Sequence, residues 1–305
     1  MAAGVWPALV TEPTMVLEVP RAKGAGDRLP KALSAGAELA KGSSARGQLP
    51  KGSSVDRGLA KASDASIAGG WRVLVPGPIG DADAALAFVD ACGFCTTGPV
   101  PGIDLPNLAD ALNATAFSVW YSAWGWKDDL HFDKRLYYGR LIRAQPTFIS
   151  LDYLPDFIAA LGGRGQEVER DPERLYQAGR LSREAFVLYQ YLVEHPEQSS
   201  RDLRARTGLR HAGVAAERAV HELQRRFLIC KVDLTGRTRG TYSYVWDLAE
   251  RFFTDAFEQA RGTAPSVARG RIRERLEGFG IKSTPALEAR LFLWQPSPTL
   301  ERGEP

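Results

Sequence analysis

Residues 182–247 read SREAFVLYQYLVEHPEQSSRDLRARTGLRHAGVAAERAVHELQRRFLICKVDLTGRTRGTYSYVWD, and this stretch decides the fold that the sequence predicts. Ser182 is a favourable helix N-cap, and apolar residues follow it at helical spacing until the proline after His195. Two further helices are expected at 201–206 and at about 212–227. The runs FLICKVDL and TYSYVWD alternate on either side of the turn TGRTRG, which predicts a β-hairpin. Three helices followed by a hairpin are typical of a winged helix-turn-helix.

Hydrophobic spacing and composition divide the rest of the chain. The stretch WRVLV at 71–75 predicts a short strand, and helix and strand patterns alternate after it. The expected fold class is mainly α with small β-hairpins, arranged as tandem winged helix-turn-helix units. The expected domains are a disordered Ala/Gly/Ser/Lys-rich tail (1–70), an N-terminal winged-helix-like unit with an aromatic block (71–163), a winged helix-turn-helix (178–250), the helical start of a further winged-helix repeat (251–296) and a second tail (297–305).

Composition argues against several classes of protein. Of the 305 residues, 44% are hydrophobic and 25% are charged, which is typical of a soluble globular chain. No apolar stretch reaches the roughly 18 residues that a membrane-spanning helix needs, and no secretion signal is apparent. Three cysteines do not make a disulfide framework and favour a reducing compartment. We therefore expect a cytoplasmic protein, associated with the nucleoid if it binds DNA.

The formal net charge of +3 hides an uneven distribution. Residues 1–70 carry all of that excess, and the remaining residues sum to zero. Within the remainder, the window 200–246 holds ten basic and four acidic residues, a net charge of +6. A basic region of this kind in an otherwise neutral chain favours a nucleic-acid partner, and double-stranded DNA is the partner we expect.

The third helix of a winged helix enters the major groove, and the hairpin tip contacts the DNA backbone. Arginines placed there can bind phosphate with two hydrogen bonds. The expected DNA-binding residues are five arginines on phosphate and one histidine near base edges: Arg206, Arg210, Arg218, Arg237, Arg239 and His211. Winged helices also serve as protein-interaction modules, and outward-facing Glu217 and Glu222 would meet phosphates unfavourably. Arg225 alternatively pairs with one of these glutamates on a solvated helix face.

Residues 117–138 hold eight aromatic side chains. Such a block forms either a hydrophobic core or a stacking platform for an unpaired base, for which Trp120, Trp124 and Trp126 are the candidates. Asp128 or Asp129 beside these rings is a candidate general base, and a solvated acidic turn explains the pair equally well.

The sequence predicts no metal site and no cofactor. Cys92 and Cys95 form a single CxxC pair without the second pair of ligands that zinc needs. Cys230 falls on the inward face of a strand and is expected in the core. No glycine-rich phosphate loop is present, so no nucleotide cofactor is expected.

The quoted stretch, together with YYGRLIRAQPTFISLDYLPDFI and ARGRIRERLEGFGIKSTPALEARLFLW, resembles the AlkZ/YcaQ-type DNA glycosylases over about residues 80–295. That family consists of bacterial enzymes with tandem winged helices that excise bulky alkylated bases and unhook interstrand crosslinks. Its catalytic signature is a Gln-x-Gln or Gln-x-Asp triplet. In rough register this chain has Gly93-Phe94-Cys95, so the family's catalytic residues are not carried over.

The resemblance implies a DNA-binding winged-helix protein related to repair glycosylases, which binds duplex DNA, damaged or undamaged. If the protein is an enzyme, the implied reaction is metal-independent hydrolysis of an N-glycosidic bond. The alternative is a non-catalytic winged-helix transcriptional regulator or protein-interaction module. The sequence alone leaves both interpretations open.

Overall fold

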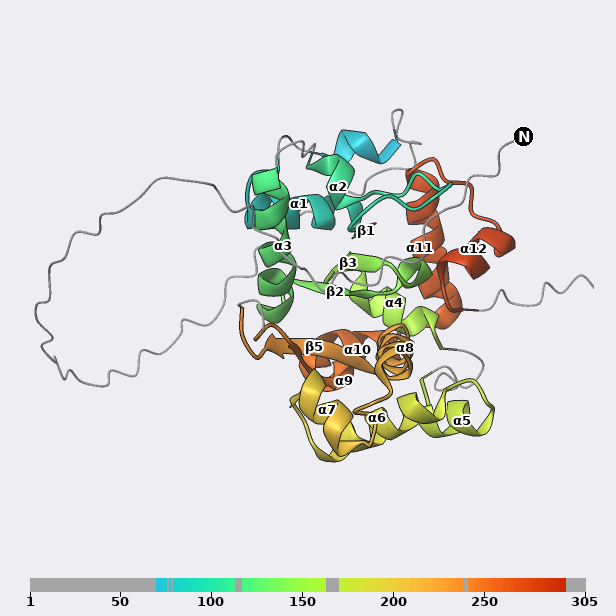
Figure 1. The fold of residues 1–305 in the computed structure, drawn as a ribbon. Helices are drawn as coiled ribbons and strands as arrows, with labels where there is room; N and C mark the ends of the chain where they lie inside the picture. The colour runs from blue at the N-terminus through green and yellow to red at the C-terminus, as the bar shows by residue number, and fades with distance from the viewer. Residues whose placement is uncertain are drawn as a thin grey trace, which may run out of the picture. The chain divides into compact units, whose positions relative to one another are not determined.

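The computed structural model describes residues 70–75, 77, 79–112, 117–162, 170–237 and 241–294, without the side chains of 117–124. The tail expected at 1–70 lies outside the described residues except for Gly70, and so does the whole tail expected at 297–305. The described chain is mainly helical and carries small antiparallel sheets, which confirms the coarse fold class (Figure 1). No helix in this part of the chain is long and apolar enough to cross a membrane.

The first unit combines three helices with a three-stranded sheet. Its elements are α1 (Ala82–Cys92), β1 (Phe94–Thr96), α2 (Leu108–Ala111), α3 (Phe117–Phe132), β2 (Leu136–Arg140) and β3 (Pro146–Ser150). The strands are antiparallel in the order β1-β3-β2, and a 3-10 turn, η2 (Ile142–Ala144), joins β2 to β3. Asp81 caps α1 by accepting a hydrogen bond from the backbone N–H of Ala84.

The second unit repeats this order of elements. It contains α6 (Arg183–Glu194), β4 (Gln198–Ser199), α7 (Ser200–Arg206), α8 (Gly213–Gln224), β5 (Ile229–Leu234) and β6 (Tyr244–Leu248), and a short helix α5 (Pro172–Gln177) precedes it. The strand order β4-β6-β5 corresponds to β1-β3-β2 of the first unit. Ser182 caps α6 as predicted, and Ser199 caps α7.

The helices after β6 complete the core of the first unit. They are α9 (Ala249–Phe252), α10 (Thr254–Arg261), α11 (Pro265–Gly278) and α12 (Pro285–Leu291). Both α10 and α11 pack against α4 (Leu154–Ala160), which follows β3 (Figure 1). The Phe94 ring of β1 lies 5.1 Å from that of Phe157 and 5.8 Å from that of Phe279. The segment expected to begin a further repeat thus belongs to the hydrophobic core of the first unit.

The strand predicted at 71–75 is wrong, because residues Gly70–Leu74 form a 3-10 helix, η1. Side chains that are neighbours in a strand point to opposite faces. Here the Trp71 indole and the Arg72 guanidinium both donate to the Asp104 carboxylate, at 3.2 and 2.7 Å. Trp71 is also buried against Phe88, so contacts with the first core override the strand propensity of this stretch.

Candidate nucleic-acid interface

The region from α7 to the first half of α8 presents a basic surface. Gly208 adopts φ +75°, the left-handed conformation that lets the chain turn sharply between the two helices. On α8, Ala219 and Leu223 are fully buried in the second core, and Ala216 is fully buried as well. The opposite side of the helix therefore faces solvent, as expected of a helix that is apolar along one stripe.

Four of the expected DNA-binding side chains lie exposed in this region, namely Arg206, Arg210, His211 and Arg218. Within the described residues, none of the three arginines makes an ion pair or a side-chain hydrogen bond. An exposed guanidinium without a carboxylate partner keeps all its donors available for an incoming anion. We call these three arginines together the α7–α8 arginine cluster.

The two glutamates expected on the outward face of α8 are both engaged. Glu217 lies 3.7 Å from Arg204 of α7, and this pair links the two helices. The Glu222 carboxylate accepts hydrogen bonds from the backbone N–H and the hydroxyl of Ser182, the latter at 2.6 Å. A carboxylate at the start of α6 is favourable because it complements the helix dipole. Glu222 thus has a local structural role in addition to its charge.

The pairing expected for Arg225 is not what the structure contains. Glu222 approaches Arg226 instead, at 4.0 Å, and the Arg226 guanidinium also donates to the Arg180 carbonyl. Burial lowers the pKa of Arg225, and the charge of Arg226 lowers it further. Arg225 is half-buried and belongs to the packed end of α8 rather than to a solvated face.

At the tip of the β5–β6 hairpin, Arg237 is bound to the first unit. Its guanidinium lies 2.6 Å from the Asp129 carboxylate of α3, and this partner raises the Arg237 pKa. Both side chains remain largely exposed, at 62% and 49%. Arg239, the other arginine expected at this tip, lies outside the described residues.

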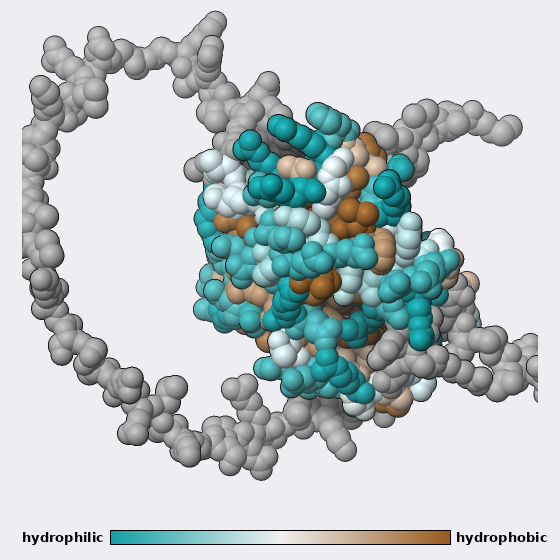
Figure 2. Space-filling model, turned by 90° about the horizontal axis from the view of Figure 1, so that it is seen from below, coloured by the Kyte–Doolittle hydropathy of each residue, from teal (hydrophilic) through white to brown (hydrophobic). Residues whose placement is uncertain are grey.

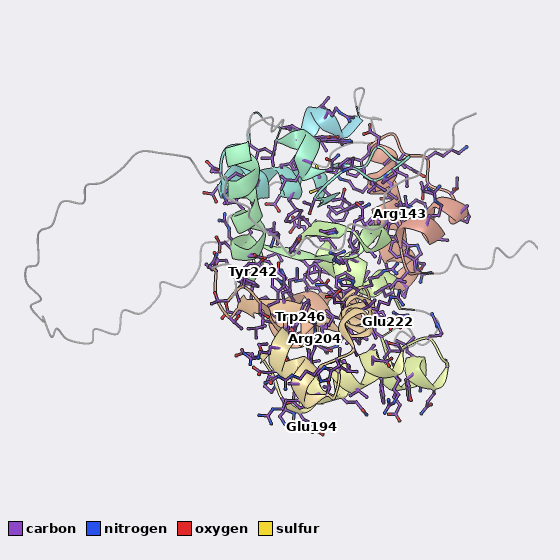
Figure 3. All side chains as sticks on the ribbon, in the orientation of Figure 1. Arg143, Glu194, Arg204, Glu222, Tyr242 and Trp246 are labelled. Carbon is purple, nitrogen blue, oxygen red and sulfur yellow. The ribbon has the colours of Figure 1, made fainter. Side chains whose placement is uncertain are left out.

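Beneath this ion pair, α3 and the hairpin share a buried polar network. The Lys127 ammonium lies 2.8 Å from Asp128 and donates to the hydroxyls of Tyr242 and Tyr244 at 3.0 and 2.8 Å. Tyr242 lies beside α3 (Figure 3), and its hydroxyl donates to the other Asp128 oxygen at 2.7 Å. Lys231 of β5 lies 3.8 Å from the centre of the Tyr244 ring, so a second cation contacts the same ring.

This network changes the interpretation of Asp128 and Asp129. Both lie within α3, so the acidic turn proposed for them is wrong. Asp128 is buried with both oxygens hydrogen-bonded, which holds the hairpin to α3, whereas Asp129 is exposed and paired. The alternation in TYSYVWD places Tyr242 and Tyr244 on one strand face, but it does not identify Lys127 or Lys231 as their partners.

The aromatic block is in part core. Tyr137 and Tyr138 are fully buried, and Trp126 is half-buried against the first core. Trp120 and Trp124 lie in α3, but their side chains are outside the described residues. Base stacking by Trp120, Trp124 or Trp126 stays a prediction.

Gly93-Phe94-Cys95, the stretch in rough register with the catalytic triplet of the glycosylases that the chain resembles, runs from the end of α1 into β1. Phe94 and Cys95 are fully buried there, and burial raises the Cys95 pKa well above its usual value. Burial also raises the pKa of Cys92 to about 12, so neither thiol is an ionised ligand or nucleophile at neutral pH. Among the described residues, no three His, Cys, Asp or Glu side chains group as metal ligands would.

Comparison with known proteins gives one match. A family model described as "AlkZ related" covers residues 79–293, from just before α1 to just after α12. No curated protein and no solved structure matches the chain. The matched region includes both units and the helices that complete the first core, so the chain belongs to the AlkZ-related family.

Proposed function

We propose that the protein binds duplex DNA through a winged helix-turn-helix formed by residues 178–250. The order of elements in the second unit supports this, because a strand between the first two helices and a hairpin after the third are features of a winged helix. In that fold α8 would be the helix that enters the major groove, with the β5–β6 hairpin as the wing. The matching order in the first unit supports a tandem arrangement.

The observation that carries the proposal is the α7–α8 arginine cluster. Its three guanidinium groups flank the exposed start of α8 and have no partner among the described residues. Figure 2 shows that the face where α6 and α7 lie is mainly hydrophilic, with apolar residues in separate small groups. A mainly polar, basic surface fits a polyanion better than an apolar partner.

Membership of the AlkZ-related family relates the chain to DNA-repair glycosylases and supports a role on damaged DNA in the cytoplasm. Base excision is not part of the proposal. A carboxylate or amide would be needed to assist cleavage of a glycosidic bond, and the buried triplet on β1 supplies neither.

Fluorescence anisotropy of the full chain with a plain duplex across a salt series tests the proposal. Each phosphate neutralised by an arginine contributes about 0.9 to the slope of log affinity against log salt. Replacing Arg206, Arg210 and Arg218 together by Gln should therefore weaken binding and reduce that slope by roughly 2.7. The matched control is Arg183→Gln, Lys282→Gln and Arg290→Gln, which removes the same charge from exposed positions on or beside α6 and α12.

The control variant should keep most of the wild-type slope. Equal losses in the two triple variants would mean that net charge alone governs binding and would contradict the assignment to α7 and α8. Absence of binding at low salt would overturn DNA binding altogether and favour a protein partner. A duplex that carries an alkylated base, titrated in parallel, measures any preference for damage.

A further inference from the structure

The start of α8 carries no long side chain, and we call this stretch the smooth segment. It consists of Gly213, Val214 and Ala215, all exposed, and a β-carbon added at Gly213 would meet no atom within 4 Å. Small residues at this point allow the helix backbone to approach a ligand closely, because little side-chain volume separates the two surfaces. The α7–α8 arginine cluster lies on either side of this segment in the sequence, before it at Arg206 and Arg210 and after it at Arg218.

Val214 is the one large side chain on this smooth segment. It is 65% exposed, more than any other large apolar residue in the described part of the chain. A β-branched residue on an exposed helix position is less favourable than alanine, so Val214 does not serve the stability of α8. One turn later, the same side of the helix carries Arg218.

We infer that Val214 contacts the C5 methyl group of a thymine in the major groove. The inference rests on the proposed function, since it requires α8 to enter that groove. Thymine is the one standard base that presents a methyl group there, and apolar side chains recognise it by direct contact. Arginines on either side that bind the phosphates of both DNA strands would position the smooth segment over the base edges between the strands.

The charge pattern of the segment agrees with this ligand. Between residues 206 and 218, Glu217 is the one acidic residue, and it is compensated by Arg204 at 3.7 Å. The remaining charged side chains of the segment are the cationic cluster, whose complement is phosphate. Val214 is thus a small apolar site within a surface that is complementary to DNA. A single exposed valine elsewhere on the surface would need no functional explanation.

Two duplexes that differ only in this methyl group test the inference. The first repeats d(TG)·d(CA), and the second has deoxyuridine in place of every thymidine. We expect the full-length wild-type chain to bind the deoxyuridine duplex about fourfold more weakly, the effect of burying one methyl group. Val214→Ala should bind both duplexes equally, and Val214→Thr, which keeps one methyl and the branched shape, should show an intermediate ratio.

The control is Val267→Ala on α11, another exposed valine near the start of a helix, which should keep the fourfold ratio. Circular dichroism checks that each variant is folded, as expected since alanine favours helix at an exposed position. Equal binding of the two duplexes by the wild type would overturn the thymine contact while leaving DNA binding intact. A ratio that persists in Val214→Ala would assign the discrimination to another residue. Binding of neither duplex would end both proposals.

Discussion

At the scale of single residues, the pair between Arg237 and Asp129 limits what the hairpin tip can do. Exposed ion pairs contribute little to stability, because water screens them and both side chains lose freedom. Arg237 is therefore held at α3 by a contact that a phosphate could replace at small cost. Any phosphate contact by Arg237 has to compete with the Asp129 carboxylate.

Asp129→Asn removes this competition. We expect the variant to bind duplex DNA more tightly, by about threefold to tenfold at low salt, with a salt slope steeper by about 0.9 for the one phosphate gained. Thermal unfolding should change little, since the lost pair is exposed. The measurement is the same anisotropy titration across salt.

Asp83→Asn provides the control, because it removes an equal charge from an exposed pair with Arg135 on the first unit. If both variants gain affinity equally, the effect is one of net charge. An unchanged slope in Asp129→Asn would mean that Arg237 does not reach phosphate.

Neighbouring residues of the same type can differ completely in burial and in their partners, and this limits what the sequence predicts for single residues. Asp128 and Asp129 are adjacent in α3, yet one is buried beside Lys127 and the other is exposed. Their difference follows from which side of α3 meets a hairpin more than a hundred residues away in the sequence. Helical spacing reveals which residues share a face, but the sequence does not identify the partner of that face.

At the scale of elements, two arginine-rich segments of similar composition have different roles. Along α11, Arg269 and Arg275 donate to backbone carbonyls at the ends of α4 and α1, and Arg271 and Arg273 pair with Asp156 and Glu288. Arg269 and Arg275 thus satisfy carbonyl groups that a helix end would otherwise leave without a partner. The α7–α8 arginine cluster caps no such group in the part of the chain that the structure describes.

The contrast gives opposite expectations for two single substitutions. Arg275→Gln should lower the free energy of unfolding by about 1–3 kcal/mol, since it removes the charged donor from the Cys92 and Ala91 carbonyls. It should leave the affinity for duplex DNA within about twofold. Arg210→Gln should do the reverse, with an unchanged melting temperature and weaker binding across salt.

Chemical denaturation and anisotropy on the same two variants decide the matter, with Arg183→Gln as an exposed control. A loss of DNA affinity in Arg275→Gln without a loss of stability would show that α11 also contacts DNA.

Composition did not separate the roles of these two arginine-rich segments, because a count of basic residues does not reveal which carbonyls lie nearby. The starts of α6 and α7 were predicted closely, since each begins at a cap residue that acts locally, Ser182 and Ser199.

At the scale of the whole described chain, one buried histidine joins the two units. The His131 side chain of α3 accepts a hydrogen bond at Nδ1 from the Tyr138 backbone N–H, at 3.0 Å. Its Nε2 therefore carries the proton and donates to the Lys231 carbonyl of β5, at 2.7 Å. Both ring nitrogens are satisfied only while the imidazole is neutral. Local sequence patterns do not reveal this contact, because it spans 100 residues and needs the folded topology.

Burial is the main cause that lowers the pKa of His131 to about 4, and the nearby Lys231 charge contributes to the same shift. In an unfolded chain the pKa is about 6.5. The neutral imidazole thus contributes stability that is fully present above about pH 6.5 and is lost as the pH falls toward 4. By this linkage, the folded state should lose about 2 kcal/mol between neutral pH and pH 5 through His131 alone.

His131→Gln isolates this contribution, because a glutamine amide can accept from the Tyr138 N–H and donate to the Lys231 carbonyl without titrating. We expect the variant to be less stable at neutral pH, since the amide leaves part of the ring volume unfilled. Its free energy of unfolding should fall less steeply with acid than that of the wild type, and the two curves should converge toward pH 5. Denaturant titrations between pH 5 and pH 8 measure the difference. Parallel curves would mean that His131 is already charged in the folded protein, which two hydrogen bonds of opposite direction do not allow.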